Sequence, residues 1–414
     1  MKRFCLILLM VWALCVIPSP VGAATDIKID MDGYKLSSDI APAIIADRTL
    51  VPFRSIAEAM QVQVEWVNET RQIEASNSNT KVILTIDSNT AYINGTPVSL
   101  DVAPQIVNNR TLIPLRFFSQ AFACKVDWDG VSRTVKIKTP AKSMQVVAYY
   151  ALGDEKTSSW TNLFGTTYPT TSIGHTTIIS DLALGWYSLD ENGQLLTKSR
   201  TGWQRPTGWE NVLAAASKYN IKSEMVIHMT NEGRLINSLL NNPSSVNTAV
   251  KQIVTEARKY AGVNLDMEGL GLSEKGSDLV KVQTSFSAFV KVLADELHKE
   301  GKSLSLSLHA PNSSYKGYDY AALGKYSDYI IIMAYDYGPK IEPDHKVDEA
   351  ITMALKNVPA GKLILGISTP KENAESLDTK VGLAKRYNLK GIAIWRLGLV
   401  TNDMWDILAS NIRP

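Results

Sequence analysis

The sequence predicts an α/β protein in which a (β/α)8 TIM barrel follows a separate N-terminal α+β domain made of two repeats. Three features of the 414-residue chain lead to this prediction. One is an internal duplication early in the chain, and another is the short polar linker Thr139–Ser143 that follows it. The third is a series of eight buried strand-like runs that alternate with helical patterns, the element order of a parallel barrel. The length and hydrophobic content suffice for two or three domains with their own cores.

Residues 1–24 have the pattern of a secretory signal peptide. Lys2 and Arg3 give a basic start, residues 4–17 form an apolar run, and residues 21–24 are small. The apolar run is shorter than the roughly 20 residues that span a bilayer, so we favour cleavage over an uncleaved anchor. We therefore expect a secreted protein with no membrane segment after cleavage.

The charge and cysteine content of the mature chain excludes several classes of protein. Loss of Lys2 and Arg3 from 43 basic residues brings them level with 41 acidic residues. A neutral chain offers no electrostatic surface for nucleic acid or an anionic membrane, and we expect neither as a partner. Cys5 and Cys15 leave with the signal, so Cys124 has no partner for an internal disulfide.

The N-terminal domain, residues 25–139, contains the duplication. Asp39–Arg54 matches Asp101–Arg116 position by position, and the match continues to Trp66 and Trp128. Each unit is expected to form a strand pair, a short helix that begins at its Pro-x-Arg segment, and a hairpin. A Trp in the same place of two copies belongs more often to a core than to a sugar-binding surface, so we expect both to be core residues.

This region resembles the copper amine oxidase N-terminal-like domain, through Arg-Thr-Leu-Val-Pro-Phe-Arg at residues 48–54 and the Trp that follows in each copy. The resemblance implies a spacer, a wall-attachment module or a partner-binding module of the kind found in duplicate beside exported cell-wall enzymes. We predict no metal site here, because no histidine precedes His175 and the acidic residues are scattered.

The second domain, residues 144–414, contains the eight alternating runs. The predicted strands are residues 145–150, 176–180, 222–228, 263–267, 303–308, 329–333, 362–367 and 391–395. Helical patterns lie between them, for example at residues 209–219, 245–260, 282–301 and 347–357. A doubly wound open sheet is the alternative, but no Gly-rich phosphate-binding turn follows the first strand.

The fourth predicted strand carries the acidic residues of interest. Residues 263, 265 and 267 are apolar and alternate with Asn264, Asp266 and Glu268, so the polar side chains share one face. An ordinary half-exposed strand has the same alternation. The acids, however, stand at the carboxyl end of the strand, where parallel barrels place their chemistry.

At strands four, six and eight this domain resembles glycoside hydrolase family 18, the chitinase and endo-N-acetylglucosaminidase family, and its bacterial spore-cortex and cell-wall members. The motifs are Gly262–Glu268, Met333–Tyr337 and Gly391–Gly398. The family pattern on strand four is Asp-Gly-x-Asp-x-Asp-x-Glu. Here Ala261 and Asn264 replace its first two Asp residues, while the last Asp and the Glu are present.

The resemblance implies that Glu268 is the general acid and that Asp266 orients the substrate's 2-acetamido group, whose oxygen attacks the anomeric carbon. A general acid must keep a proton near neutral pH. Because the two acids share a face, we expect their repulsion to keep the proton on Glu268. Asn264 is expected to hydrogen-bond Asp266 within the same substrate-binding site.

The resemblance also implies a sugar cradle. The Tyr335 hydroxyl would bind the acetamido oxygen, the Asp336 carboxylate would help to fix the sugar, and Trp395 would form the apolar floor. Tyr149, at the end of the first strand, is a further candidate for this wall.

Other residues with chemical potential give weaker signals. We predict no metal ligands and no cofactor, because the five histidines have no metal-ligand spacing and are expected to be structural or at the surface: His175, His228, His298, His309 and His345. Four tryptophans are either core residues or walls of a glycan groove: Trp160, Trp186, Trp203 and Trp209. Strand seven lacks the inserted subdomain usual in the family, so the cleft is expected to be open and shallow.

These observations favour a secreted, cell-wall-associated hydrolase that cleaves β-1,4 linkages of an N-acetylglucosamine-containing glycan, peptidoglycan or chitin-like. One alternative is a catalytically inactive, lectin-like protein on the same barrel, but retention of Glu268 argues against it. Another is a structural or adhesion protein in which the duplicated module carries the function.

Overall fold

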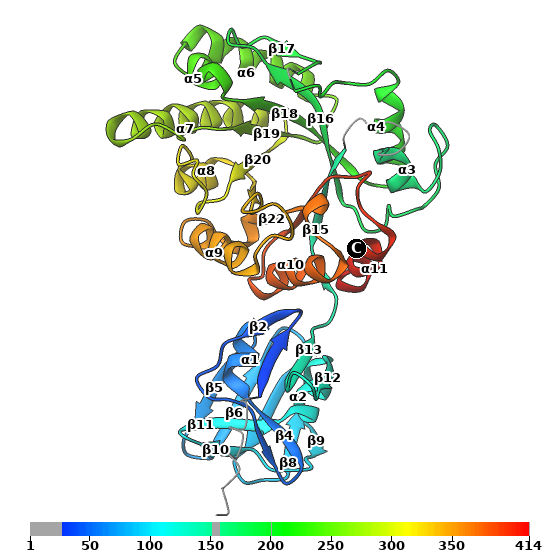
Figure 1. The fold of residues 1–414 in the computed structure, drawn as a ribbon, viewed down its shortest axis with the longest axis vertical. Coiled ribbons are helices and arrows are strands. Elements are labelled where there is room, and N and C mark those ends of the chain that lie inside the picture. Colours follow the sequence, from blue (N-terminus) through cyan, green and yellow to red (C-terminus); the bar gives the residue numbers. More distant parts are fainter. Residues whose placement is uncertain (1–26, 151–157, 200, 414) are drawn as a thin grey trace, which may run out of the picture.

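The computed structural model describes residues 27–150, 158–199 and 201–413, and the predicted signal peptide lies outside these ranges. An N-terminal β-rich domain and a barrel domain follow one another along the chain (Figure 1). Within the described ranges, no helix is long and apolar enough to cross a membrane.

The N-terminal domain contains two copies of one series of elements. The first copy comprises β1 (Lys28–Met31), β2 (Tyr34–Leu36), β3 (Ala43–Ile45), β4 (Arg48–Pro52), α1 (Phe53–Ala59), β5 (Gln63–Val67) and β6 (Gln72–Ser76). The second comprises β8 (Thr90–Ile93), β9 (Thr96–Ser99), β10 (Gln105–Val107), β11 (Arg110–Pro114), α2 (Leu115–Phe122), β12 (Lys125–Asp129) and β13 (Thr134–Lys138). The expected order of strand pair, short helix and hairpin is present in both, and β7 (Lys81–Thr85) joins them.

The two copies exchange strands instead of folding side by side. β1 of the first copy pairs in parallel with β13 of the second, and β4 pairs with β11. In the second pair Val51 lies opposite Ile113, its own counterpart in the other copy, so the copies are related by an approximate twofold axis at this point. Both helices cover one shared core, to which each contributes apolar residues such as Ile56 and Phe118.

The barrel domain is a closed ring of eight parallel strands. In spatial order they are β15 (Gln145–Tyr150), β23 (Gly391–Trp395), β22 (Leu363–Ser368), β21 (Tyr329–Met333), β20 (Ser303–His309), β19 (Gly262–Glu268), β18 (Lys222–Thr230) and β16 (Asp181–Leu189). Pairing of β15 with β16 closes the ring. The predicted TIM barrel is therefore confirmed.

One strand was predicted in the wrong place. Residues 176–180 were expected to form the second strand as one of the alternating strand-like runs, yet they lie in turns that precede it. The strand is the next segment, β16, in which every residue is buried. Burial on both faces of a parallel sheet outweighs the local preference of β-branched residues.

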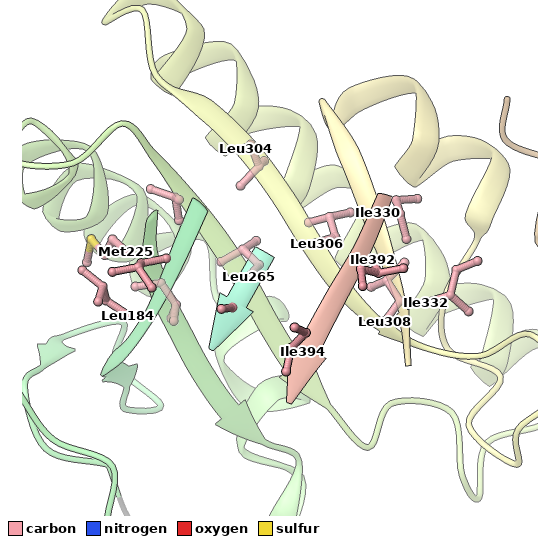
Figure 2. Packing of buried hydrophobic residues seen from close by; sticks show 14 of the residues in the cluster. Leu184, Met225, Leu265, Leu304, Leu306, Leu308, Ile330, Ile332, Ile392 and Ile394 are labelled. Atoms are coloured by element: carbon pink, nitrogen blue, oxygen red, sulfur yellow. The ribbon is translucent and has the colours of Figure 1, made fainter. Parts of the chain in front are cut away.

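The helices surround the ring and cover its outer face. They are α3 (Ser159–Phe164), α4 (Trp209–Lys218), α5 (Leu235–Leu240), α6 (Pro243–Ala257), α7 (Gly276–Lys299), α8 (Tyr320–Tyr326), α9 (Asp344–Leu355), α10 (Ala374–Arg386) and α11 (Asn402–Asn411). Alternate strand residues such as Leu265, Leu306 and Ile392 point outward into this layer (Figure 2). The smaller apolar group inside the ring includes Val226, Ile331 and Ile364.

The N-terminal domain docks against α10, the helix that connects β22 to β23. Asp32 is 4% exposed, and its carboxylate lies 3.3 Å from the ammonium group of Lys385 and accepts a hydrogen bond from the Thr139 amide at 2.9 Å. A Cβ atom at Gly382 would lie 2.5 Å from the Cβ of Asp32, so this approach requires glycine. The linker is held as well, because β14 (Lys142–Ser143) pairs with β24 (Ile412–Arg413).

Candidate active site

The polar face of β19 points into the barrel as its alternation predicts. Val263, Leu265 and Met267 belong to the layer between strands and helices. Asn264, Asp266 and Glu268 therefore face the interior, since successive strand residues point to opposite sides. The last two lie at the carboxyl end of the strand, where the ring opens.

A cavity of about 580 Å³ lies at this end of the barrel. Six of the predicted site residues line it: Tyr149, Asp266, Glu268, Tyr335, Asp336 and Trp395. They come from β15, from β19, from the segment after β21 and from β23. Strands far apart in the sequence thus bring the predicted residues to one place. Asn264 is the exception.

Two histidines that the sequence analysis set aside lie beside Glu268. His228 is on β18, where it pairs with Asp266 in register, and its Nε2 is 3.3 Å from Glu268 Oε1. His309 ends β20 on the other side, with Nε2 3.6 Å from Glu268 Oε2. The strand order of a parallel barrel could have identified both histidines, because each stands near the carboxyl end of a strand adjacent to β19. His175 and His298 lie elsewhere, beside Trp405 and Asp328.

Contrary to our expectation, the pKa values of Asp266 and Glu268 do not favour the proton on Glu268. Burial, and then repulsion from Glu268, raise the pKa of Asp266 well above its usual range. Burial also raises the pKa of Glu268, but the hydrogen bond and charge of His228 outweigh it, and the pKa of Glu268 is lowered. These opposite shifts favour the proton on Asp266 over Glu268, and the hydrogen bond and charge of His228 are the main reason.

Asn264 does not reach the cavity, and its predicted hydrogen bond to Asp266 is not formed. It is fully buried inside the ring. Its amide donates to Ser305 Oγ at 2.8 Å, and its oxygen accepts from Ser307 Oγ at 2.9 Å. Asp266 Oδ1 is left without a hydrogen-bond partner among the described residues. Asn264 therefore supports the strand from below and does not touch a sugar bound in the cavity.

A column of hydrogen bonds continues from Asn264 through the barrel. Below it, Ser305 Oγ and Tyr329 Oη donate to the buried carboxylate of Glu224, at 2.8 and 2.7 Å. Burial raises the pKa of Glu224 to about 7. Above it, the Ser307 hydroxyl is bonded to Tyr149 Oη.

The direction of this upper bond follows from the number of protons. The Ser307 hydroxyl has a single proton, which it donates to Asn264 Oδ1. Tyr149 must therefore be the donor in its hydrogen bond with Ser307. The lone pairs of the Tyr149 oxygen remain available at the cavity wall. Burial raises the pKa of Tyr149 well above its usual range, so the phenol is neutral.

The segment after β21 is held by a buried carboxylate that no sequence motif singles out. Glu342 accepts the backbone amides of Asp336 and Tyr337 at 2.8 and 3.0 Å. The side chain of Asp336 stays largely exposed and lies 3.2 Å from the ammonium group of Lys371. Tyr335 points to the cavity, where burial raises its pKa well above the usual range. The predicted cradle residues are thus present, with Asp336 at the rim.

Aromatic rings form one wall of the cavity. Trp395 contacts Tyr149 edge to face, with ring centroids 5.1 Å apart, and Trp203 at 5.2 Å. Trp203 lies over Gly185 of β16, where a Cβ atom would be 2.6 Å from its ring. Of the four tryptophans left open by the sequence, Trp203 packs against Trp395 and does not itself line the cavity. Trp160 and Trp186 are buried in the core.

Among the residues that the structure describes, one group of side chains could geometrically hold a cation. His228, Asp266 and Glu268 offer ligand atoms that all lie within 4.8 Å of one another. His228 and Glu268 already satisfy each other, however, and we assign no metal to them.

The tryptophans of the N-terminal repeats are not core residues, contrary to expectation. Trp66 and Trp128 are 37% and 41% exposed. They stand on the outer hairpin strands β5 and β12, whose side chains are mostly at the surface, while the apolar residues of β6 and β13 fill the core.

Each copy also contributes to a shallow groove that the other copy completes. Trp66 lines one groove, of about 340 Å³, with Ile106 and Arg110 from the second copy. The equivalent groove, of about 350 Å³, is lined by Arg48 from the first copy and Asp101 from the second. Arg48 pairs with Asp101 across the copies at 3.0 Å, and their counterparts Arg110 and Asp39 pair likewise.

A ring of parallel strands with two acids, phenols and an indole at its carboxyl end has the architecture of a TIM-barrel glycosidase. Residues 145–371 match Glycosyl hydrolases family 18, and the chain belongs to this family. Residues 30–137 match the Copper amine oxidase N-terminal domain, which precedes the barrel.

Known relatives agree with this assignment. The uncharacterized glycosylase YvbX of Bacillus subtilis (strain 168) is 23% identical over 346 residues, which cover 66% of this chain and 92% of the relative. The cortical fragment-lytic enzyme of the same organism is 23% identical over 296 residues, 54% of this chain and 65% of that enzyme. A class V chitinase structure from Pseudomonas fluorescens Pf-5 superposes with a TM-score of 0.54 at 21% identity, covering 65% of this chain and 99% of the chitinase.

Proposed function

We propose that the protein is a secreted hydrolase that cleaves β-1,4 linkages of N-acetylglucosamine-containing cell-wall glycan by substrate-assisted, retaining hydrolysis. The observation that carries this proposal is the convergence of Asp266, Glu268, Tyr335 and Trp395 on one cavity. The fold alone would not suffice, because one barrel supports many reactions. The residue types in the cavity match what hydrolysis of a 2-acetamido sugar needs.

Each step has a residue to perform it. Glu268 protonates the leaving oxygen as the glycosidic bond breaks, and the acetamido oxygen of the substrate bonds to the anomeric carbon. Asp266 lies where it can accept the acetamido N–H, and its free Oδ1 is an unused acceptor in the described structure. The Tyr335 hydroxyl donates to the acetamido oxygen, and Trp395 supports the apolar face of the ring. Water then opens the cyclic intermediate, with Glu268 as the base.

Incubation of the purified protein with peptidoglycan and with chitin oligosaccharides tests this function. We expect new reducing ends with the wild type and almost none with Glu268→Gln. The first product released should keep the β configuration, which NMR detects before mutarotation. Equal release by both proteins would refute the role of Glu268.

A lectin-like protein on the same barrel is the alternative. It would bind the oligosaccharides without releasing reducing ends, and Glu268→Gln would leave binding unchanged. We favour the hydrolase over the lectin-like protein, because sugar binding alone does not require a carboxylate flanked by two histidines.

We also propose that the N-terminal domain attaches the enzyme to the cell wall. Trp66 and Trp128 are both exposed, and they occupy equivalent positions in two copies that differ elsewhere, for example Phe53 and Leu115. Packing would explain why both copies have a Trp at this position if it lay in the core, but it does not explain a Trp at an exposed position. An exposed indole beside arginine and acid side chains suits a sugar ring and its hydroxyls.

Export is part of the proposal, and it rests on the signal pattern of residues 1–24. N-terminal sequencing of the protein recovered from culture medium or washed cell walls should begin near residue 24 or 25. Retention of Met1 in that fraction would contradict it.

A further inference from the structure

The two histidines beside Glu268 differ in protonation. The Gly269 amide donates to His309 Nε2 at 3.3 Å, so this nitrogen bears a lone pair and the ring is neutral. Burial lowers the pKa of His309 in agreement. His228 Nε2 faces Glu268 Oε1 directly, and its Nδ1 lies 3.4 Å from the Thr201 hydroxyl. A hydroxyl can accept from Nδ1, so His228 can be protonated on both nitrogens.

We propose that His228 stores the proton that Glu268 delivers to the glycosidic oxygen. This inference rests on the proposed function and deepens it. His228 is a positioning residue that acts through Glu268, and the resting pair is an imidazolium with a carboxylate. The storage explains how Glu268 can serve as an acid although its pKa is lowered.

The proton transfers balance over one catalytic cycle. A bound sugar displaces water from the cavity, and low polarity favours a neutral pair over an ion pair. The proton then moves from His228 Nε2 to Glu268 Oε1, which leaves a neutral imidazole and a carboxylic acid. Glu268 passes it to the leaving oxygen as that bond breaks. When water attacks the anomeric carbon, Glu268 takes a proton from it and returns it to His228.

The groups that face His228 favour its charged form. Burial lowers its pKa, but the hydrogen bond to Glu268 and the negative charge of the acid pair outweigh burial, and the pKa is raised. His309, on the far side of Glu268, is neutral. The other buried titratable groups at the cavity wall, Tyr149 and Tyr335, are neutral phenols because burial raises their pKa. Trp203 packs near the His228 ring, at 6.5 Å between centroids, and carries no charge.

An NMR titration of the imidazole signals tests the coupling without requiring activity. The protein has five histidines, and the spectrum of His228→Gln identifies the signal that disappears. In Glu268→Gln we expect the pKa of His228 to fall by about one unit or more, because a carboxylate next to a cation shifts its pKa by that amount. An unchanged His228 pKa would overturn the inference. If the wild type titrates as expected but releases no reducing ends, only the proposed function fails.

The pH dependence of kcat/KM gives a second test on soluble chitin oligosaccharides. In His228→Gln the proton must reside on Glu268 itself, so the basic limb should move to lower pH by about one unit or more while KM changes little. His309→Gln should lower the rate without moving the limb, because His309 holds no proton toward Glu268. His298→Gln, at the exposed end of α7, is the matched control. A uniform loss at all pH values in His228→Gln would show a structural role and contradict the storage.

Discussion

The two domains present the side chains of their proposed functions in opposite ways. In the barrel, Asp266 and Glu268 lie in a cavity where burial and near neighbours change their pKa values. In the N-terminal domain, Trp66 and the Arg48–Asp101 pair lie at the surface. The side chains of Arg48 and Asp101 are 46% and 39% exposed. Exposed ion pairs contribute about 1 kcal/mol or less, whereas charges in a cavity interact strongly. Changes in the barrel should therefore alter chemistry, and changes in the grooves should alter attachment alone.

The largest effect is expected from Glu268→Gln, which retains the shape of the acid and removes its proton. We expect kcat to fall by about 10³-fold or more, within the range of general acid catalysis. Pelleting with insoluble peptidoglycan should be unchanged. Glu296→Gln, on the exposed face of α7, is the control and should alter neither. Loss of pelleting in Glu268→Gln would contradict the assignment of catalysis to the barrel and of attachment to the N-terminal domain.

The contact between the domains is the exception, because it buries charge in an otherwise exposed region. Asp32→Ala leaves Lys385 buried without its carboxylate partner and should lower the free energy of unfolding by about 4 kcal/mol. Thermal unfolding measures this loss. Asp87→Ala removes an exposed pair with Arg71 and should cost less than about 1 kcal/mol. Equal losses in both variants would mean that the domain contact is no stronger than a surface pair.

A pH effect on stability is expected from the barrel interior. The pKa of Glu224 is raised to about 7 from 4.5, so the folded protein binds more protons than the unfolded chain between these values. The free energy of unfolding should therefore fall as the pH rises from about 4.5 to 7, by about 3 kcal/mol from this group. Glu224→Gln keeps an acceptor for Tyr329 and should flatten that slope.

Chemical denaturation at pH 5 and pH 8 compares the two proteins. The stability of Glu224→Gln relative to the wild type should be greater at pH 8 than at pH 5. Asp295→Asn replaces an exposed acid on α7 and should leave the slope as it is in the wild type. An identical slope in all three proteins would show that Glu224 is ionised in the folded state at no cost.

The smallest effect concerns attachment. Replacing both Trp66 and Trp128 by Ala should weaken binding to insoluble peptidoglycan by about tenfold, since an aromatic contact contributes about 0.5–1.5 kcal/mol beyond its buried area. Hydrolysis of soluble oligosaccharides should be unchanged. Tyr92→Ala is the matched control, because this ring is 40% exposed on the same domain but has no aromatic counterpart in the first copy. Equal loss in the control would remove the case for the tryptophans.

Sequence patterns predicted the barrel and most of the residues at its mouth, because alternation and motif order depend on local spacing. Asp266, Glu268, Tyr335 and Trp395 line one cavity as expected. The misplaced second strand shows the limit of such patterns: the strand-like run at residues 176–180 lies in turns, and the fully buried segment after it forms the strand.

The electrostatics of the site could not be predicted in the same way. His228 and His309 lie beside Glu268 on the two neighbouring strands, and only their places near the carboxyl ends of those strands indicate this proximity. Asn264 does not form its expected hydrogen bond to Asp266, because its side-chain amide is hydrogen-bonded to Ser305 and Ser307 on β20. Exposure of Trp66 likewise depends on which hairpin strand faces the shared core.

The exchange of strands between the two copies bears on how such a domain could have arisen. A protein with one copy would leave the edge of β1 open, and a second molecule could supply its β13 and complete the same sheet. The present domain is then equivalent to a homodimer whose subunits have been fused into one polypeptide. Fusion makes folding independent of protein concentration, so such a domain can fold at any dilution. Proteolytic nicking between the copies, near residue 80, should leave the two halves associated.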